Sequence, residues 1–95
     1  MTGPVVIQKR AEARGEAVLW TGDNAAEIVA WSEGHAYVAE GGTLYVETKK
    51  RGDVPADIGD WIVLGPVPED YYPCDPPAFA AGWEVIGLRL PGERS

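Results

Sequence analysis

The stretch that decides the fold is a β-rich run interrupted by two glycines: Ala36-Tyr37-Val38-Ala39-Glu40-Gly41-Gly42-Thr43-Leu44-Tyr45-Val46-Glu47-Thr48. On both sides of the glycines the run is rich in β-branched and aromatic residues, which pack well on a pleated surface. Glycine accepts the positive φ angles of a tight connection at no steric cost. The run therefore predicts a β-hairpin, with strands over 36–39 and 43–48.

A short helix is expected in front of this hairpin, over residues 23–31. Asp23 is a residue type that caps a helix N-terminus, and Ile28 shares one face of the helix with Trp31. Gly34 is a natural end for the helix, because glycine adopts the left-handed conformation that often follows a last turn.

The N-terminal fifth of the chain is expected to be extended. Val5-Val6-Ile7 starts a strand, and residues 11–20 alternate loosely between apolar and polar side chains around Gly15. We expect a bend or a bulge at Gly15, since an isolated glycine in a strand often marks one.

Four further elements are expected after the hairpin. They are a buried strand over 59–65, an extended segment over 71–74, a short helix over 75–81 and a final strand over 83–86. Residues 49–57, with Gly52 and Pro55, are expected to form a polar turn region. This order predicts an α+β fold, a small and mainly antiparallel sheet of about five strands with one or two short helices packed on it.

Composition predicts one soluble domain over residues 1–95, with residues 1–3 and 90–95 frayed. The chain has 95 residues, 45% of them hydrophobic, and no run of 18 apolar residues. A single cysteine, Cys74, cannot form an internal disulfide, and an unpaired thiol is typical of a reducing compartment. We therefore expect a cytoplasmic protein with no membrane association.

A formal net charge of −7 disfavours binding to nucleic-acid polymers, whose phosphates such a field repels. The eight basic residues are nevertheless clustered. Two clusters are Lys9, Arg10 and Arg14, and Lys49, Lys50 and Arg51. Each cluster is a candidate for contacts with phosphate groups, as are the backbone N–H groups at the helix start near Asn24.

Catalysis and metal binding find little support in the sequence. His35 is the one imidazole and is expected to be exposed in a turn, about forty residues from Cys74. One histidine and one cysteine do not make a tetrahedral metal site, so neither a metal nor another cofactor is expected. Glu69 and Asp70 are adjacent carboxylates with no second catalytic group in view. We therefore expect the protein not to be an enzyme.

The aromatic residues are the most informative set, because four tryptophans and four tyrosines exceed what a domain of this size needs. Trp31 and Phe79 fit helix faces that point into a core. Trp20, Tyr71 and Tyr72 are at the ends of expected elements, next to Gly, Asp and Pro. These three are candidates for stacking on a base or a partner, and packing under a loop is the alternative that remains open.

Several segments together resemble a family of small accessory proteins of tailed phages and prophages. The resemblance rests on Trp20-Thr21-Gly22-Asp23-Asn24, Gly59-Asp60-Trp61-Ile62-Val63, Tyr71-Tyr72-Pro73-Cys74, Phe79 and Trp83-Glu84. It departs from the family pattern where Glu69-Asp70-Tyr71 replaces the usual Gly-Glu-Phe. It implies a compact α+β fold and a phage origin, so that the cytoplasm would be that of an infected or lysogenic bacterium; most such proteins have no assigned activity.

The first hypothesis for function is therefore non-catalytic binding of a small nucleotide-like ligand. Its concrete form is an anti-defence sponge, which sequesters a nucleotide-derived immune signal and acts as a homo-oligomer. The candidate ligand-binding residues are Trp20, Asn24, Arg10, Lys49, Arg51, Asp60, Tyr71 and Tyr72. Two alternatives remain: a module that binds a host or virion protein, and a small hydrolase that uses Glu69 or Asp70.

Overall fold

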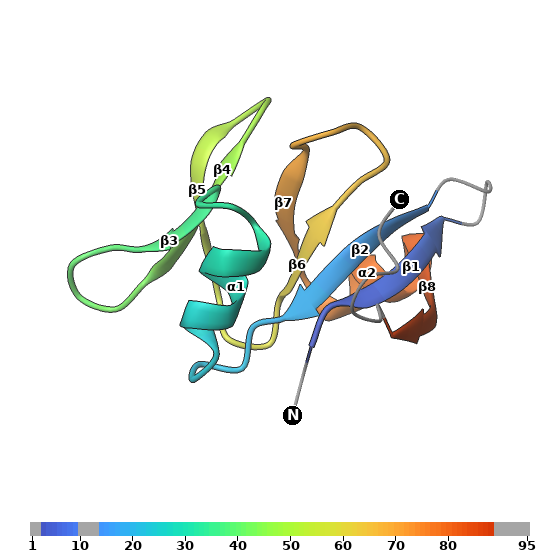
Figure 1. Ribbon diagram of the computed structural model, residues 1–95, viewed down its shortest axis with the longest axis horizontal. Helices are drawn as coiled ribbons and strands as arrows, with labels where there is room; N and C mark the ends of the chain where they lie inside the picture. The colour runs from blue at the N-terminus through green and yellow to red at the C-terminus, as the bar shows by residue number, and fades with distance from the viewer. Residues whose placement is uncertain (1–2, 10–13, 89–95) are drawn as a thin grey trace.

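The computed structural model describes residues 3–9 and 14–88. Arg10, one of the predicted ligand contacts, lies outside the described residues. The elements, in chain order, are β1 (Val5–Lys9), β2 (Arg14–Leu19), α1 (Ala25–Trp31), β3 (Ala36–Val38), β4 (Leu44–Thr48), β5 (Gly52–Ala56), β6 (Trp61–Leu64), β7 (Tyr71–Cys74), α2 (Pro76–Gly82) and β8 (Trp83–Leu88) (Figure 1).

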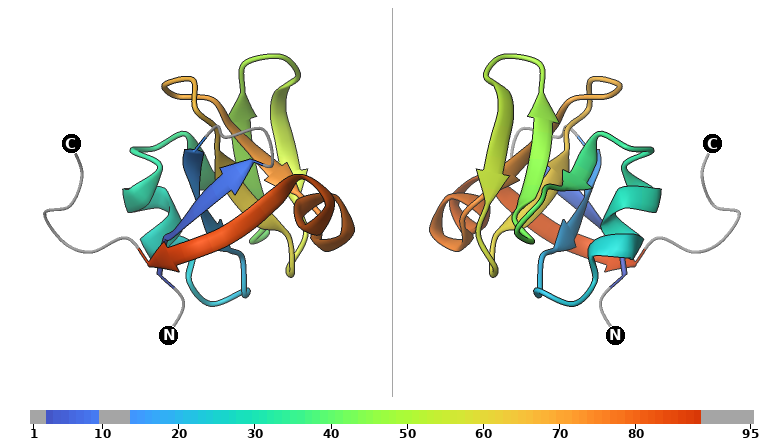
Figure 2. Two further views of the ribbon diagram at one scale, coloured as in Figure 1. Left: turned by 90° about the vertical axis from the view of Figure 1, so that its right-hand side faces the viewer. Right: turned by 90° about the vertical axis from the view of Figure 1, so that its left-hand side faces the viewer.

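The strands form two antiparallel sheets. One has five strands in the order β7-β6-β2-β1-β8, and the other has three in the order β3-β4-β5. The two helices lie on opposite sides of the molecule, α1 beside the three-stranded sheet and α2 beside β8 (Figures 1 and 2). The predicted α+β class with a five-stranded antiparallel sheet is confirmed, and the second sheet is an addition to it.

The hairpin predicted over residues 36–48 is present as β3 and β4, with Tyr37 opposite Tyr45. Gly41 and Gly42 have φ angles of 100° and 91°. In the connection, the Ala39 N–H donates to the Thr43 carbonyl at 2.9 Å. The two glycines therefore perform the role that the sequence predicts for them.

The expectation of a turn over residues 49–57 is wrong for most of that segment, because Gly52–Ala56 forms β5 and pairs with β4. The turn is limited to Lys49, Lys50 and Arg51, and the hydroxyl of Thr48, just before it, donates to the Gly52 carbonyl at 2.7 Å. Pro55 has no N–H for a ladder, but β5 is an edge strand, where proline is tolerated. Val54 lies opposite Val46, which continues the apolar inner face.

Gly15 is not a bend or a bulge. It pairs regularly with Ile7 in β1, and the register shift lies instead between Val6 and Ile7, where β1 meets β8. A Cβ atom at Gly15 would lie 2.2 Å from the Leu64 carbonyl oxygen. Glycine is required here because two backbones approach each other closely.

The start of α1 also differs from the prediction. Asn24, not Asp23, occupies the N-cap position, and the Asp23 carboxylate accepts a hydrogen bond from the Thr21 hydroxyl at 2.6 Å. The end is as expected: the Gly34 N–H donates to the Val29 carbonyl, and Gly34 has a φ of 88°. Ile28 and Trp31 are the buried residues of this helix.

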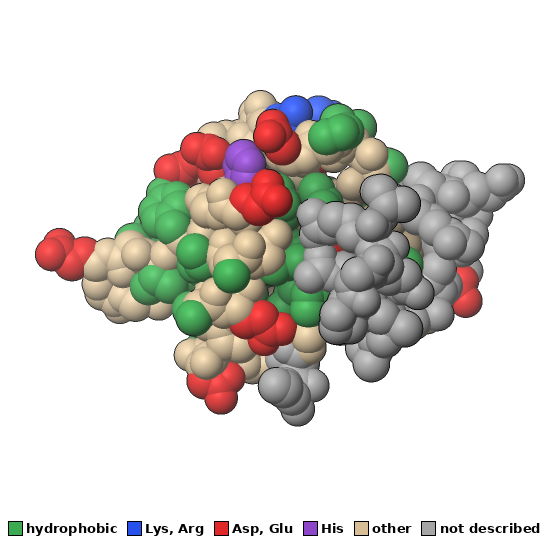
Figure 3. Space-filling model, in the orientation of Figure 1, with side chains coloured by type: hydrophobic (Ala, Val, Ile, Leu, Met, Phe, Trp, Pro, Cys, Tyr) green, Lys and Arg blue, Asp and Glu red, His purple; other side chains and the backbone are tan. Residues whose placement is uncertain are grey.

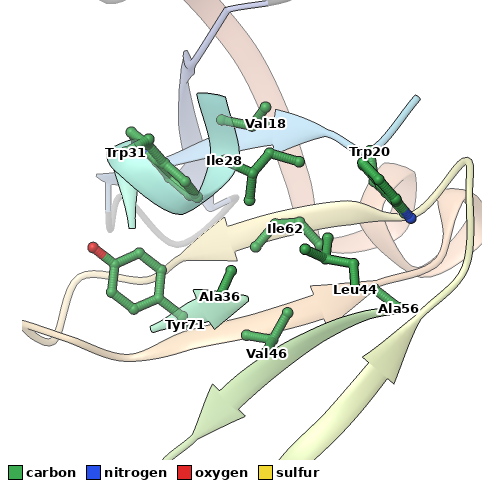
Figure 4. Packing of buried hydrophobic residues seen from close by; sticks show 10 residues of the cluster. All are labelled: Val18, Trp20, Ile28, Trp31, Ala36, Leu44, Val46, Ala56, Ile62 and Tyr71. Atoms are coloured by element: carbon green, nitrogen blue, oxygen red, sulfur yellow. The ribbon is translucent and has the colours of Figure 1, made fainter. Parts of the chain in front are cut away.

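Two hydrophobic clusters hold the fold together. The larger lies between α1 and the two sheets, and Figure 4 shows its residues: Val18, Trp20, Ile28, Trp31, Ala36, Leu44, Val46, Ala56, Ile62 and Tyr71. The smaller lies on the other face of the five-stranded sheet, beneath α2, and consists of Ile7, Ala17, Val63, Phe79 and Trp83. Because successive strand residues face opposite sides, Ile62 belongs to one cluster and Val63 to the other.

Candidate functional site

A cavity of about 280 Å³ lies between the β4–β5 turn and the start of β7. Its lining residues are Thr48, Lys49, Lys50, Arg51, Asp70, Tyr71 and Tyr72. We call it the basic-turn cavity. Figures 1 and 2 show the β4–β5 turn and the β6–β7 loop rising from the same end of the molecule. Two segments about twenty residues apart in the sequence therefore form its two walls.

One wall of the basic-turn cavity is cationic. The turn is held by Thr48, whose hydroxyl accepts from the Arg51 N–H at 2.9 Å. Lys49, Lys50 and Arg51 are exposed, and none of them forms an ion pair with a carboxylate in the described part of the chain. Lys and Arg side chains appear in blue over this turn in Figure 3. Three unpaired cations on one short turn create a local positive field in a chain of net charge −7.

The opposite wall contains the carboxylate of Asp70. Two backbone hydrogen bonds hold the main chain of Asp70 in place. The Gly65 N–H donates to the Asp70 carbonyl at 3.1 Å, and the Asp70 N–H donates to the Val67 carbonyl at 3.2 Å. Glu69, its neighbour, has a φ of 64° and does not line the cavity. The wall thus offers one hydrogen-bond acceptor opposite three cationic donors.

Tyr71 does not provide an open stacking surface; of the two alternatives that the sequence leaves open, its ring adopts the packed one. Its side chain is only 5% exposed. The ring meets Trp31 edge to face, with centroids 5.4 Å apart, and stacks on His35 at 5.0 Å. Burial is possible because β7 packs against the larger cluster, and Tyr71 faces it. Tyr71 closes the floor of the basic-turn cavity rather than presenting a free face.

Tyr72 points to the other side of β7, because neighbouring strand residues alternate between faces. Its ring packs against the smaller cluster, and its hydroxyl accepts a hydrogen bond from Trp83 Nε1 at 3.2 Å. Burial raises the pKa of the Tyr72 phenol, although the Trp83 hydrogen bond acts in the opposite direction. Tyr72 is half-buried, so only part of it faces the cavity.

Three other predicted contacts lie together at a different place and perform structural roles. Trp20 is buried, and its backbone N–H donates to the Asp60 carbonyl at 2.9 Å. The Asn24 side chain accepts from the Thr21 N–H at 3.0 Å and donates to the Leu19 carbonyl at 2.8 Å. Asp60 accepts from the Asp57 N–H at 2.9 Å. The structure therefore separates Trp20, Asn24 and Asp60 from the basic-turn cavity.

The predicted set is thus divided. Lys49, Arg51, Tyr71 and Tyr72 converge on one cavity. Lys50 and Asp70 line the same cavity but were not among the eight candidate ligand-binding residues; Lys50 was named only as a member of a basic cluster, and Asp70 only as a possible catalytic carboxylate. The signal for Lys50 was present, since it is the middle residue of a short basic turn. Asp70 carried no such signal, because its approach to that turn depends on contacts between β4 and β7.

His35 and Cys74 do not form a catalytic pair. His35 is partly buried rather than exposed, stacked on Tyr71, with Nδ1 3.1 Å from Glu47 Oε1. Cys74 packs against the smaller cluster with Trp61 and Tyr72. Burial raises the pKa of the Cys74 thiol, and the charges of Asp75 and Asp60 raise it further. A thiol held protonated is a poor nucleophile.

Two further observations on the described residues concern metal binding and membrane crossing. No group of three or more His, Cys, Asp or Glu side chains within residues 3–9 and 14–88 is placed to hold a metal ion. In the same ranges no helix has both the length and the apolar character that crossing a bilayer requires.

Comparison of the chain with protein-family models, with curated proteins and with solved structures found no match. The site is therefore characterised by its own geometry: a cationic turn facing a carboxylate across a cavity whose floor is a buried tyrosine.

Proposed function

We propose that this protein binds a small anionic, nucleotide-like ligand in the basic-turn cavity and releases it unchanged. One observation carries the proposal: Lys49, Lys50 and Arg51, which have no carboxylate partner in the described chain, line the same cavity as Asp70 and the two tyrosines. Phosphate oxygens would accept hydrogen bonds from the cationic side chains. The Asp70 carboxylate would accept from a ribose hydroxyl or a base amino group.

The cavity has cations on one wall and a carboxylate on the other, which favours a nucleotide over an inorganic anion. An inorganic anion would gain from the turn but would be repelled by Asp70 on the opposite wall. A nucleotide carries a charged phosphate at one end and hydrogen-bond donors at the other, so it satisfies both walls. Stacking contributes less than the sequence suggested, because Tyr71 is buried and only part of Tyr72 is exposed.

The volume of the cavity sets the size of the ligand. About 280 Å³ lies just below the range of roughly 300 to 1,000 Å³ that ligand pockets span. A mononucleotide-sized group fits this space in part, and a larger signalling nucleotide needs additional walls. A second copy of the chain would supply them, which is the reason to retain the homo-oligomer in the proposal.

Binding without turnover is proposed because the described residues that line the cavity do not form a catalytic set. Asp70 is the one carboxylate among these described residues, and neither His35 nor Cys74 belongs to them. A hydrolase at Glu69 or Asp70 would need a second acid or base within reach of the substrate. In biological terms, the proposal is the phage anti-defence sponge, acting stoichiometrically in the bacterial cytoplasm.

The experiment is a thermal-shift screen with mononucleotides, linear dinucleotides and cyclic dinucleotides, followed by recovery of the ligand. A ligand that binds the folded state alone raises the melting temperature in proportion to its saturation. The recovered ligand is then analysed by mass spectrometry. A stabilising ligand that is recovered intact supports the proposal. A ligand that is recovered hydrolysed supports the alternative hypothesis that the protein is a small hydrolase.

Lys50→Gln provides the first site-specific test of this binding. Its control is Ala30→Glu, which lowers the net charge by the same single unit at an exposed position of α1 that does not line the cavity. We expect Lys50→Gln to weaken binding several-fold and Ala30→Glu to leave it nearly unchanged. Equal effects of the two substitutions would mean that net charge, rather than the basic-turn cavity, controls binding.

A second candidate function, protein interaction, has its own observation. On the outer face of the three-stranded sheet, Tyr37 and Tyr45 stack with centroids 5.8 Å apart, and Pro55 lies opposite Tyr45. Tyr37 is partly exposed and donates from its hydroxyl to Asp53 at 2.5 Å. Exposed aromatics are common anchors in protein interfaces. Loss of a pulled-down partner from Tyr37→Ala, with nucleotide binding intact, would favour this candidate.

A further inference from the structure

A second cavity, of about 240 Å³, lies at the opposite end of the β4–β5 pair from the basic turn. Its lining residues are Trp20, Gly42, Thr43, Leu44, Ala56, Asp57 and Ile58. None of them lines the basic-turn cavity, so the two sites are separate. We call it the indole cavity, after Trp20.

Trp20 presents an unused hydrogen-bond donor to the indole cavity. Its side chain is 95% buried, yet Nε1 donates to no protein group in the described part of the chain. Every fully buried side-chain nitrogen and oxygen there has a partner, so Nε1 must reach the surface. Figure 4 shows the indole nitrogen at the lower end of the ring, on the side where Leu44 and Ala56, which also line the cavity, are drawn. An indole N–H can only donate, so at the surface it is available to an acceptor from outside the described chain.

Asp57 supplies the complementary group. Its N–H is used in the bond to Asp60, but its exposed carboxylate accepts no hydrogen bond from a described residue. Buried Leu44 and Ala56 form an apolar wall, and Ile58 is 69% exposed at the rim. The indole cavity therefore combines one donor, one negative acceptor and an apolar surface.

We propose that the indole cavity binds an extended peptide segment that contains a basic residue. A main-chain carbonyl accepts from Trp20 Nε1, a Lys or Arg side chain pairs with Asp57, and an apolar side chain packs on Ile58. An anionic ligand is disfavoured by Asp57. A purely apolar ligand leaves both the indole N–H and the carboxylate without partners, which costs free energy on desolvation.

The test is a two-dimensional ¹H–¹⁵N titration of the full chain that follows the four indole N–H signals. The probes are acetyl-Leu-Arg-Leu-amide and the acidic control acetyl-Leu-Glu-Leu-amide. The Trp20 signal is assigned from Trp20→Phe, or from through-space contacts to Leu44 if that variant does not fold. We expect the basic peptide to move the Trp20 signal selectively and the acidic peptide to move it much less.

Asp57→Asn and Asp75→Asn form a matched pair, since each removes one exposed charge and only Asp57 lines the cavity. We expect Asp57→Asn to weaken binding of the basic peptide about two- to fivefold, which is the contribution of an exposed ion pair. We expect Asp75→Asn to leave this binding unchanged. The proposal is overturned if neither peptide moves the Trp20 signal, if the acidic peptide moves it equally, or if both variants weaken binding alike. A shift of the amides of residues 48–51 in place of Trp20 would also contradict it.

Discussion

The two ends of the β4–β5 pair carry opposite chemistry although they belong to the same two strands. At the turn, Lys49, Lys50 and Arg51 line a cavity and have no carboxylate partner in the described chain. At the other end, Trp20 and Asp57 line a second cavity, where the indole N–H and the carboxylate have no partner among the described residues. A small sheet thus has three unpaired cations at one end and an exposed carboxylate at the other.

The difference shows that net charge describes this surface poorly. A formal charge of −7 predicts repulsion of phosphates everywhere, yet Lys49, Lys50 and Arg51 gather on one exposed turn and form no ion pair within the described residues. Charge is screened within about 10 Å at moderate salt, so each end acts through its own local field. Substitutions that act on both ends, on one end, or beside one end therefore test whether the two ends are independent.

The largest effect is expected from Gly15→Ala, which should disrupt both ends through the fold. The added Cβ would lie 2.2 Å from the Leu64 carbonyl oxygen, so β2 and β6 would have to separate. We expect a loss of about 3 to 5 kcal/mol in the free energy of unfolding, measured by urea denaturation.

Gly41→Ala is the control for this prediction, because its positive φ is strained for alanine but nothing lies within 4 Å of the added Cβ. It should cost about 1 to 2 kcal/mol. Equal losses for the two variants would show that the close approach at Gly15 is not the decisive feature.

The next effect is confined to the basic-turn end of the β4–β5 pair. The triple variant Lys49→Gln, Lys50→Gln and Arg51→Gln removes the positive field of the basic-turn cavity. We expect at least about tenfold weaker nucleotide binding by calorimetry, equivalent to about 1.4 kcal/mol, since hydrogen bonds to charged groups contribute about that much each. Peptide binding at the indole cavity should be unchanged, and a parallel loss there would contradict the separation of the two ends.

A smaller effect is expected beside the basic turn, from Tyr72→Phe. Phenylalanine keeps the ring but removes the acceptor of the Trp83 Nε1 hydrogen bond. We expect a loss of about 1 kcal/mol in the free energy of unfolding. If the ligand contacts only the turn and Asp70, its affinity should stay within twofold; a larger change would assign Tyr72 a direct role.

The smallest effect concerns the pH dependence of Cys74. Burial, then the charges of Asp75 and Asp60, raise the pKa of its thiol. Its stabilising contribution is therefore present below the ordinary thiol pKa and is lost as the pH rises through the raised value. We expect the pH profile of iodoacetamide alkylation to lie at higher pH in the native chain than in the urea-unfolded chain. Coincident profiles would contradict this.

The sequence predicts the elements whose signals are local. Gly41 and Gly42 identify the hairpin, and the apolar run around Ile62 identifies a buried strand. β5 was missed because Gly52, Asp53 and Pro55 are turn formers in isolation, and only pairing with β4 makes them a strand. Gly15 was assigned a bend because its sequence does not reveal that the Leu64 backbone approaches it.

The candidate site was predictable only in part, for the same reason. Lys49 and Arg51 are identified by local clustering, but burial of Tyr71 depends on Trp31 and His35, which are distant in the sequence. Stacking and packing were both open for Trp20, and the structure packs its ring into the larger cluster, where it is only 5% exposed. Which face of an aromatic ring remains free is decided by tertiary packing.

The central claim is that the cationic turn and Asp70 bind one ligand between them. The most direct measurement is a ¹H–¹⁵N titration with the nucleotide that gives the largest thermal shift, mapped onto the backbone amides. The account predicts that the largest shifts fall on residues 48–52 and 70–72, and that the ligand remains intact throughout. Shifts confined to other segments, or conversion of the ligand during the titration, would contradict it.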